Sequence, residues 1–237
     1  MSAFAESLST AAALVLQADP VLLRTVRLSL AVSASACLLA AGFGLAGGAW
    51  LAVTRFAGRR ALVAVLNTLL ALPSVVVGLV VYLLLSRSGP LGSWGILFTP
   101  GAMVIAQTIL VLPVVAALTR QLVDDGLREG GDPLRSMGAR PFTAALLMLV
   151  HERWAVLTVM LTAFGRAVSE VGAVMIVGGN IDGVTRVITT TIALETSKGD
   201  LPLALALGLV LLALVGVVNA GITAAQRAQG GGLAVAR

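Results

Sequence analysis

The stretch LSLAVSASACLLAAGFGLAGGAWLAVT, residues 28–54, holds 27 consecutive residues without one charged side chain. About 20 such residues in an α-helix cross the roughly 30 Å hydrocarbon core of a bilayer, where each backbone N–H and C=O must be bonded within the helix. Three further stretches, 61–86, 88–119 and 201–226, are also free of charge, and a fifth, 154–177, is interrupted only by Arg166 and Glu170. The sequence therefore predicts an all-α fold, a polytopic membrane bundle of about five transmembrane helices.

The composition agrees with one membrane domain. Hydrophobic residues make up 58% and charged residues 11% of the 237, and the mean hydropathy is +1.02. So few charges cannot cover a hydrated surface, and the five stretches leave no room for a second folded domain. We expect residues 1–27 to be an extracytoplasmic segment with a short peripheral helix, residues 28–226 the transmembrane domain, and residues 227–237 a cytoplasmic tail. Cys37 is the single cysteine, which excludes a disulfide within the chain.

The basic residues are distributed as orientation signals rather than as a nucleic-acid surface. With the N-terminus outside and five alternating helices, ten arginines fall on the cytoplasmic side and five basic residues fall outside. This excess follows the positive-inside rule, which the opposite orientation would violate. We therefore predict a multi-pass protein of the plasma or inner membrane, surrounded by lipid, with a cytoplasmic C-terminus and no nucleic-acid partner. The ten are Arg55, Arg59, Arg60, Arg120, Arg128, Arg135, Arg140, Arg153, Arg227 and Arg237.

The polar segment 120–153 is expected to be a cytoplasmic loop, since it is too polar to enter the membrane and too short to be a domain. Within it, DPLRSMG at 132–138 is typical of a miniature helix. Asp132 would cap it, Pro133 would occupy the first turn, and Gly138 would end it in the left-handed conformation. Leu134 and Met137 would then present two adjacent apolar side chains to a groove on a partner. The alternative is a solvated connector.

Arg166 and Glu170 are the only charges expected at membrane depth. Four residues apart, they would share one face of a helix within ion-pair reach. An unpaired charge at the bilayer centre costs about 2.5–3.5 kcal/mol on insertion scales, so the pair should face the bundle interior. It can act as a gate or as a structural clamp. Pro73, beside Ser74, should kink the second helix, which suits a pathway, although prolines are common in membrane helices generally.

Four segments carry a resemblance to a known family. FGRAVSEVGAVMIVGGNI at 164–181, IALETSKGD at 192–200 and ALPSVVVG at 71–78 are similar to the permease subunit of tungstate importers, near relatives of molybdate and sulfate permeases. DPLRSMG matches the register of the coupling segment of ABC importer permeases, with a degenerate triplet ahead of Gly138. The match runs from about residue 28 to residue 219. It implies the type I ABC importer permease fold and a tetrahedral oxyanion as substrate, most of all tungstate.

The resemblance implies roles for three groups of residues. Gly178 and Gly179 could offer backbone N–H groups to an oxyanion, or could simply give flexibility where a loop begins. Thr189 could line a polar route or cap a helix. The expected gate and pathway residues are Pro73, Ser74, Arg166, Glu170, Gly178, Gly179, Asn180 and Thr189. The expected ATPase-coupling residues are Asp132, Leu134, Arg135, Met137 and Gly138, and those for docking of a binding protein are Arg186, Glu195 and Lys198.

A separate ATPase follows from what the chain lacks, and the resemblance implies the rest of the assembly. Its one lysine, Lys198, follows no glycine-rich loop, so we expect no ATP hydrolysis here and no enzyme activity. Two cytoplasmic ATPase subunits, which hold ATP and Mg²⁺, would supply energy, a second copy of the chain would complete a homodimer, and an extracytoplasmic oxyanion-binding protein would deliver the anion. We expect this chain to bind no cofactor and, because His151 has no second ligand at metal spacing, no metal.

Three alternatives remain. A molybdate or sulfate permease would belong to the same class. An intramembrane enzyme would use Arg166 and Glu170 as a catalytic pair, but the sequence offers no nucleophile, metal set or second acid to cooperate with them. An ion channel would need no cytoplasmic docking segment.

Overall fold

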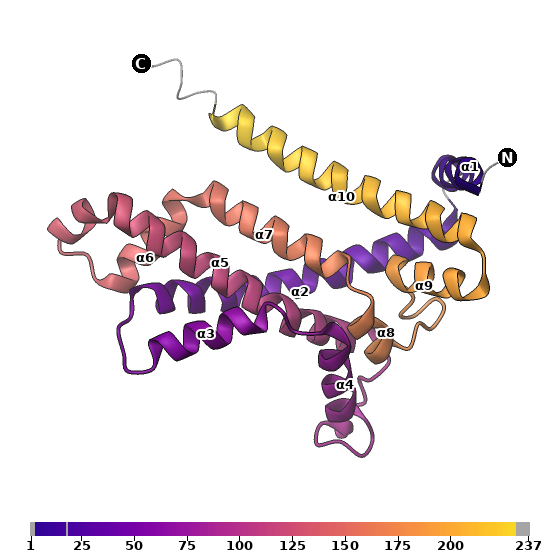
Figure 1. The fold of residues 1–237 in the computed structure, drawn as a ribbon, viewed down its shortest axis with the longest axis horizontal. Coiled ribbons are helices and arrows are strands. Elements are labelled where there is room, and N and C mark those ends of the chain that lie inside the picture. The colour runs from indigo at the N-terminus through magenta and orange to yellow at the C-terminus, as the bar shows by residue number, and fades with distance from the viewer. Residues whose placement is uncertain (1–2, 18, 231–237) are drawn as a thin grey trace. The chain divides into compact units, whose positions relative to one another are not determined.

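The computed structural model describes residues 3–17 and 19–230, and within these residues all regular structure is helical, as predicted (Figure 1). The chain divides into two compact units, Leu30–Thr185 and a unit made of Met1–Ser29 with Arg186–Arg237. The helices are α1 (Ala3–Leu16), α2 (Pro20–Val53), α3 (Arg59–Leu69), α4 (Ser74–Leu85), the 3-10 turn η1 (Gly92–Trp94), α5 (Pro100–Ser136), α6 (Pro141–His151), α7 (Arg153–Val168), α8 (Gly172–Gly178), α9 (Ile188–Lys198) and α10 (Leu201–Gly230).

Among the described residues, three helical stretches are long and apolar enough to cross a membrane: Pro20–Val53, Pro100–Gly131 and Leu201–Gly221. Two pairs of helices also qualify if each pair counts as one broken span. These are α3 with α4, bent by 99°, and α6 with α7, bent by 80°. The structure therefore has three to five candidate spans, consistent with the predicted polytopic bundle.

The second predicted span, 61–86, is broken rather than kinked. α3 ends at Leu69 and α4 begins at Ser74, and Pro73 between them is extended, with φ −65° and ψ 120°. Proline has no N–H with which to continue a helical ladder. Its carbonyl oxygen instead accepts hydrogen bonds from the N–H groups of Val76 and Val77. Pro73 thus stands at the start of a new helix and not in the middle of one.

The third predicted span starts later than residue 88. Residues 88–99 form turns and η1, and α5 begins at Pro100. Glycines and Pro90 interrupt this apolar segment, and Gly95 is left-handed at φ +62°. Pro113, by contrast, lies inside α5 without ending it. The absence of charge therefore identified an apolar segment but not the first residue of its helix.

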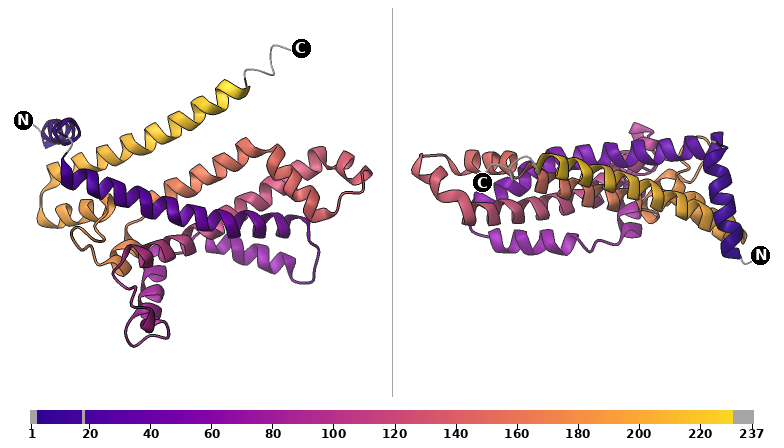
Figure 2. Two further views of the ribbon diagram at one scale, coloured as in Figure 1. Left: turned by 180° about the vertical axis from the view of Figure 1, so that it is seen from behind. Right: turned by 90° about the horizontal axis from the view of Figure 1, so that it is seen from above.

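The unit 30–185 is organised around α5, against which α3, α4, α6, α7 and α8 all pack (Figures 1 and 2). One buried core of this unit joins three helices. Cys37 and Ala40 come from α2, Val111 and Val115 from α5, and Ala163 from α7. The small side chains let the helices approach closely, as is common in membrane bundles.

Glycines of α2 make this close approach possible. Two of them lie against α5, and two others face open space. A Cβ atom on Gly48 would lie 2.5 Å from the carbonyl oxygen of Ala116 and 2.8 Å from Cβ of Thr119, both on α5. Gly44 is similarly close to Val115. Gly42 and Gly47 have nothing within 4 Å of such an atom. Close packing against α5 therefore involves one face of α2 only.

Replacing Gly48 with valine should destabilise the bundle, because the new side chain would collide with α5 backbone that cannot rotate away. Overpacking of this kind costs about 1–3 kcal/mol. The matched control is Gly47→Val, which adds the same side chain one residue earlier, where there is space. Thermal unfolding of the detergent-solubilised chain should show a lower midpoint for Gly48→Val than for Gly47→Val. Equal midpoints would contradict the packing described here.

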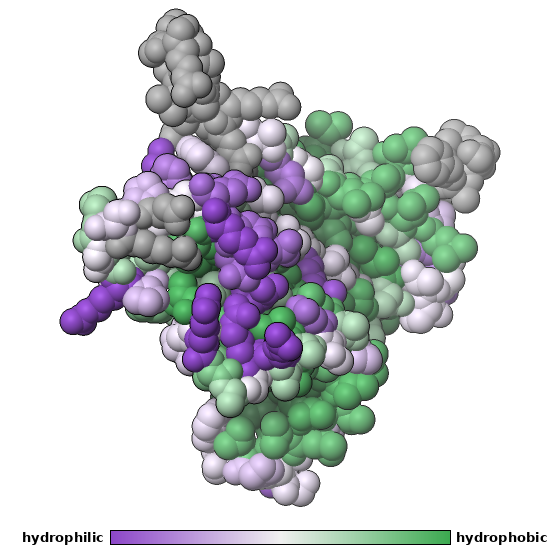
Figure 3. All heavy atoms as spheres, turned by 60° about the vertical axis from the view of Figure 1, so that its left-hand side comes forward, coloured by the Kyte–Doolittle hydropathy of each residue, from purple (hydrophilic) through white to green (hydrophobic). Residues whose placement is uncertain are grey.

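Each end of the unit 30–185 brings together segments that were predicted to lie on the same side of the membrane. At one end, the turn after α2 meets the polar part of α5, where Arg59 Nη2 lies 3.8 Å from Asp124 Oδ2. At the other, Phe98 donates its backbone N–H to the carbonyl oxygen of Val177 at 3.0 Å. Figure 3 shows hydrophilic side chains gathered at the first end and hydrophobic ones spread over α4.

The second unit is smaller. α1 and α9 both pack against α10, and Leu22, Ile188 and Leu207 form its buried core. The predicted short N-terminal helix is present as α1, but the first long helix begins at Pro20 rather than at residue 28. Asp19 explains this start, because its Oδ1 accepts hydrogen bonds from the N–H groups of Val21, at 2.9 Å, and Leu22, at 2.8 Å.

Candidate functional site

A helix break lies within the stretch 154–177, which was predicted to cross the membrane as one helix. α7 ends at Val168 and α8 begins at Gly172, so the expectation that Arg166 and Glu170 share one helical face is wrong. The Ser169 hydroxyl donates to the carbonyl oxygen of Arg166 at 3.1 Å, closing the last turn of α7. Glu170 lies beyond that turn, and its Oε1 accepts the backbone N–H of Ala173 at 3.1 Å. Its carboxylate therefore caps the first turn of α8, a position that the positive end of a helix dipole favours.

Arg166 lies half-buried in the last turn of α7. Its Nε atom is buried, and among the described residues it has no hydrogen-bond partner. A buried donor without a partner costs about 1–3 kcal/mol, and more when it is charged. Guanidinium groups bind oxyanions through charge-assisted hydrogen bonds. The break therefore carries a buried cationic donor that has no partner in the described structure.

Gln107 on α5 is a site residue that the sequence analysis missed. Its side chain is 4% exposed, and Nε2 donates to the carbonyl oxygen of Ala167 at 2.9 Å. The same carbonyl oxygen, in the last turn of α7, also accepts the backbone N–H of Glu170 at 3.2 Å. Gln107 Oε1 is buried without a partner in the described structure. The available signal was that Gln107 is the only amide side chain in the stretch 88–119.

The start of α4 packs beside the same break. A Cβ atom on Gly172 would lie 2.9 Å from Oγ of Ser74, and one on Gly78 would lie 2.7 Å from Cα of Ala173. α4 and α8 can approach this closely only because both positions are glycine. The structure thus brings Pro73 and Ser74 together with the segment that holds Glu170, and these residues form one cluster at two facing helix breaks.

Gly178, Gly179 and Asn180 form a tight turn rather than an anion nest. Gly179 is left-handed at φ +69°, and its N–H donates to the carbonyl oxygen of Met175 at 2.9 Å, so it is not offered to a ligand. The carbonyl oxygen of Gly178 accepts the hydroxyl of Thr185 at 2.6 Å. Asn180 is also left-handed, at φ +49°. The geometry therefore supports the alternative interpretation, in which these glycines are needed for the backbone conformation of the turn.

Thr189 and the three residues expected to dock a binding protein lie in the other unit. Thr189 is buried in the first turn of α9, but the cap is made by Thr190, whose hydroxyl accepts the N–H of Val187 at 3.0 Å. At the other end of α9, Lys198 Nζ lies 2.9 Å from Glu195 Oε1. Lys198 is mostly exposed. Arg186 precedes α9 and is half-buried.

The polar segment 120–153 is not a loop. α5 continues through it to Ser136, and the predicted miniature helix beginning at Asp132 is wrong. Arg120, Asp124 and Arg128 are spaced four residues apart, and Asp124 Oδ2 lies 3.3 Å from Arg120 Nη1 and 3.9 Å from Arg128 Nη2. Such pairs stabilise the polar extension of the helix. The side chains of Asp132 and Arg135 lie outside the described residues.

The stop at Gly138 is confirmed. Gly138 has φ +76°, and the N–H of Ala139 donates to the carbonyl oxygen of Leu134 at 3.1 Å, the bond of a left-handed C-cap. Met137 beside it is 79% exposed. Leu134 instead lines a hollow of about 490 Å³ between α5 and α6, together with Met148. The two expected apolar side chains are therefore not equivalent, and Met137 is the one that projects.

Apolar helices that are broken beside a charged side chain are typical of membrane transport proteins. The chain is 42% identical over 226 residues to the tungstate uptake system permease protein of Peptoclostridium acidaminophilum, covering 95% of this chain and 99% of that protein. It is 44% identical over 197 residues to a "Probable anion ABC transporter permease protein" of Haloferax volcanii, covering 81% and 85%. The chain belongs to the ABC transporter permease family.

A third relative, the tungstate uptake system permease protein of Campylobacter jejuni, is 43% identical over 155 residues, which is 65% of each chain. No family model matches the chain.

Proposed function

We propose that this chain is the transmembrane permease subunit of an ATP-driven, binding-protein-dependent importer of a tetrahedral oxyanion, tungstate. The observation that carries the proposal is the 42% identity, across nearly the whole of both chains, to a tungstate uptake permease. Arg166 supports it from the structure, because a buried guanidinium donor at a helix break suits an oxyanion. Molybdate and sulfate are the alternatives within the same class.

The oxyanion would pass the cluster at the two helix breaks. Arg166 attracts the anion there, and Glu170 fixes the start of α8 so that the break keeps its shape. A site that held the anion too tightly would not release it, so a change in the position of Arg166 must accompany transport. α5 can transmit that change, because one helix connects the turn at Met137 with Gln107, which is bonded to the end of α7.

The partners are part of the proposal. A second copy of the chain completes the pathway, two cytoplasmic ATPase subunits dock at the turn 137–140, and an extracytoplasmic binding protein delivers the anion near Arg186, Glu195 and Lys198. Copurification separates this function from the other classes. A permease brings down a cytoplasmic ATPase, whereas an intramembrane enzyme or an ion channel does not.

The orientation can be tested with single cysteines in a Cys37→Ala background. Ser88, Ser136 and Ser197 are all exposed and lie in segments assigned to different sides. An impermeant thiol reagent applied to intact cells should label Ser88→Cys and Ser197→Cys and should spare Ser136→Cys until the cells are permeabilised. Labelling of Ser136→Cys from outside would overturn both the orientation and the docking assignment.

A further inference from the structure

Four arginines gather around a single carboxylate where α2 and the polar part of α5 meet. Asp124 Oδ2 lies 3.3 Å from Arg120 Nη1, 3.8 Å from Arg59 Nη2 and 3.9 Å from Arg128 Nη2. Arg55 lies beside them and has no hydrogen-bond or ion-pair partner among the described residues. One negative charge thus stands against four positive charges, an excess that makes the place attractive to an anion.

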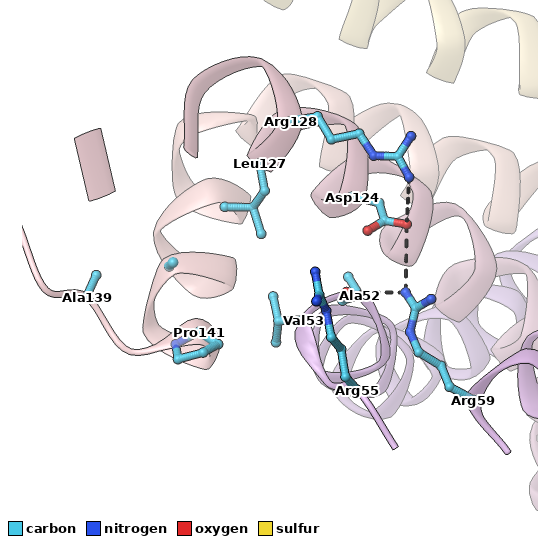
Figure 4. A pocket seen from close by; sticks show the side chains of 10 residues that line it. Ala52, Val53, Arg55, Arg59, Asp124, Leu127, Arg128, Ala139 and Pro141 are labelled. Atoms are coloured by element: carbon cyan, nitrogen blue, oxygen red, sulfur yellow. Dashed lines mark hydrogen bonds and ion pairs between the residues drawn. The ribbon is translucent and has the colours of Figure 1, made fainter. Parts of the chain in front are cut away.

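Arg55, Arg59 and Arg128 line a hollow of about 400 Å³ together with Asp124 (Figure 4). Arg59 is held in place on one side, because its Nε and Nη2 donate to the carbonyl oxygens of Leu51, at 3.0 Å, and Ala52, at 3.3 Å. Arg55 extends from the end of α2 into the hollow, as Figure 4 shows. Asp124 is the only acidic residue among those that line it. Arg59 is thus held by backbone carbonyl groups, whereas no such bond holds Arg55 in the part of the chain that the structure describes.

The rest of the wall suits a group with an apolar side. Val53, Leu127 and Ala144 line the hollow together with Pro141 at the start of α6. The N-terminus of an α-helix carries a partial positive charge, which adds to the field of the arginines. Arginine also matches the geometry of phosphate, to which it can donate two parallel hydrogen bonds.

The hollow lies where apolar helices end. Arg55 directly follows the uncharged stretch 28–54, and Arg120 directly follows the stretch 88–119. The rings of Trp50 and Phe56 stack nearby with their centroids 5.4 Å apart, and aromatic residues are enriched at the surface of the bilayer. Lipid phosphates occupy that depth, and basic pockets at the cytoplasmic ends of transmembrane helices bind anionic headgroups.

We propose that this hollow binds a phosphate group, supplied by the headgroup of an anionic phospholipid or by free phosphate. Arg55 contacts the phosphate, and Arg59 and Arg128 contribute positive electrostatic potential around it. The apolar wall accommodates the glycerol end of a lipid. The site goes beyond the proposed function and does not depend on which oxyanion is transported.

The test is the thermal unfolding midpoint of the full chain, purified in neutral detergent, during titration with short-chain phosphatidylglycerol, short-chain phosphatidylcholine or inorganic phosphate. Phosphatidylglycerol should raise the midpoint, and phosphatidylcholine should not. In Arg55→Gln the concentration that gives half of the shift should rise about fivefold, the expected loss for one arginine near anionic lipid. Arg60→Gln is the matched control, since it removes the same charge from the same turn but does not line the hollow.

The titrations with lipid and with inorganic phosphate distinguish the two possible sources of the phosphate group. A shift with inorganic phosphate that also depends on Arg55 identifies free phosphate as a ligand, and a shift with phosphatidylglycerol alone identifies lipid. The proposal is overturned if neither ligand raises the midpoint, or if Arg60→Gln weakens the effect as much as Arg55→Gln. It is also overturned if Arg55→Gln leaves the lipid response intact and instead reduces recovery of the ATPase, which would make the hollow a contact for an acidic group of that partner.

Discussion

Replacing Arg166 with glutamine is expected to reduce oxyanion uptake by roughly 10- to 150-fold, the loss that follows from removing one charged hydrogen bond. The amide keeps some polar character but has no charge to attract the anion. The chain itself should fold, because Nε of Arg166 makes no hydrogen bond to the described protein. Uptake in reconstituted vesicles, together with the recovery of monodisperse protein, measures the two effects separately.

The matched control is Arg153→Gln, at the other end of the same helix, which should transport normally. Glu170→Gln should also fold and should keep transport, since an amide oxygen can still cap α8. The charge-swapped pair Arg166→Glu with Glu170→Arg should not restore transport, because the two residues do not share a helical face. Full transport by the swapped pair would refute the role given to Arg166.

A charge at position 137 is expected to separate the permease from its ATPase. Met137 is exposed at the end of α5, and Met137→Asp would place a carboxylate in the apolar groove that the docking proposal assigns to the partner. Loss of a central interface residue costs about 2 kcal/mol or more, which weakens binding about 30-fold. Copurification of the ATPase should fall accordingly while the permease stays in the membrane. Met137→Leu, which keeps the volume, should retain the ATPase.

Gly138 provides an independent variant for the same surface. Valine is strained at φ +76°, whereas asparagine tolerates that conformation. Gly138→Val should therefore lose the ATPase, and Gly138→Asn should keep it. If ATPase recovery and substrate-stimulated hydrolysis are unchanged in Met137→Asp and Gly138→Val, the turn is only a connector.

The fold class could be predicted from sequence because a charge-free stretch reports directly that a segment is apolar. It does not report where a helix breaks. Pro73 and Pro113 are the same residue in similar surroundings, yet one begins a helix and the other lies inside one. In the structure α4 starts where Gly172 lets α8 approach Ser74. That contact joins residues far apart in the chain.

In the candidate site, too, some features could be predicted from the local sequence and others could not. Gly138 was predictable, because a left-handed helix stop is a local property of glycine. The extension of α5 was also predictable in principle from the four-residue spacing of Arg120, Asp124 and Arg128, a signal that was read only as polarity. The bond from Gln107 to Ala167, and the meeting of Arg59 with Asp124, depend on tertiary structure and could not have been derived from local pattern.

The most direct test of the account is tungstate uptake by the complete complex. The permease, its ATPase and its binding protein would be reconstituted in vesicles, with ATP on the side of the ATPase and tungstate, molybdate or sulfate on the other. We predict ATP-dependent accumulation of tungstate, with tungstate preferred over the other two anions, and none when the ATPase or the binding protein is left out. Accumulation without ATP, or no tungstate uptake by the complete complex, would contradict the assignment of this chain as the permease of a tungstate importer.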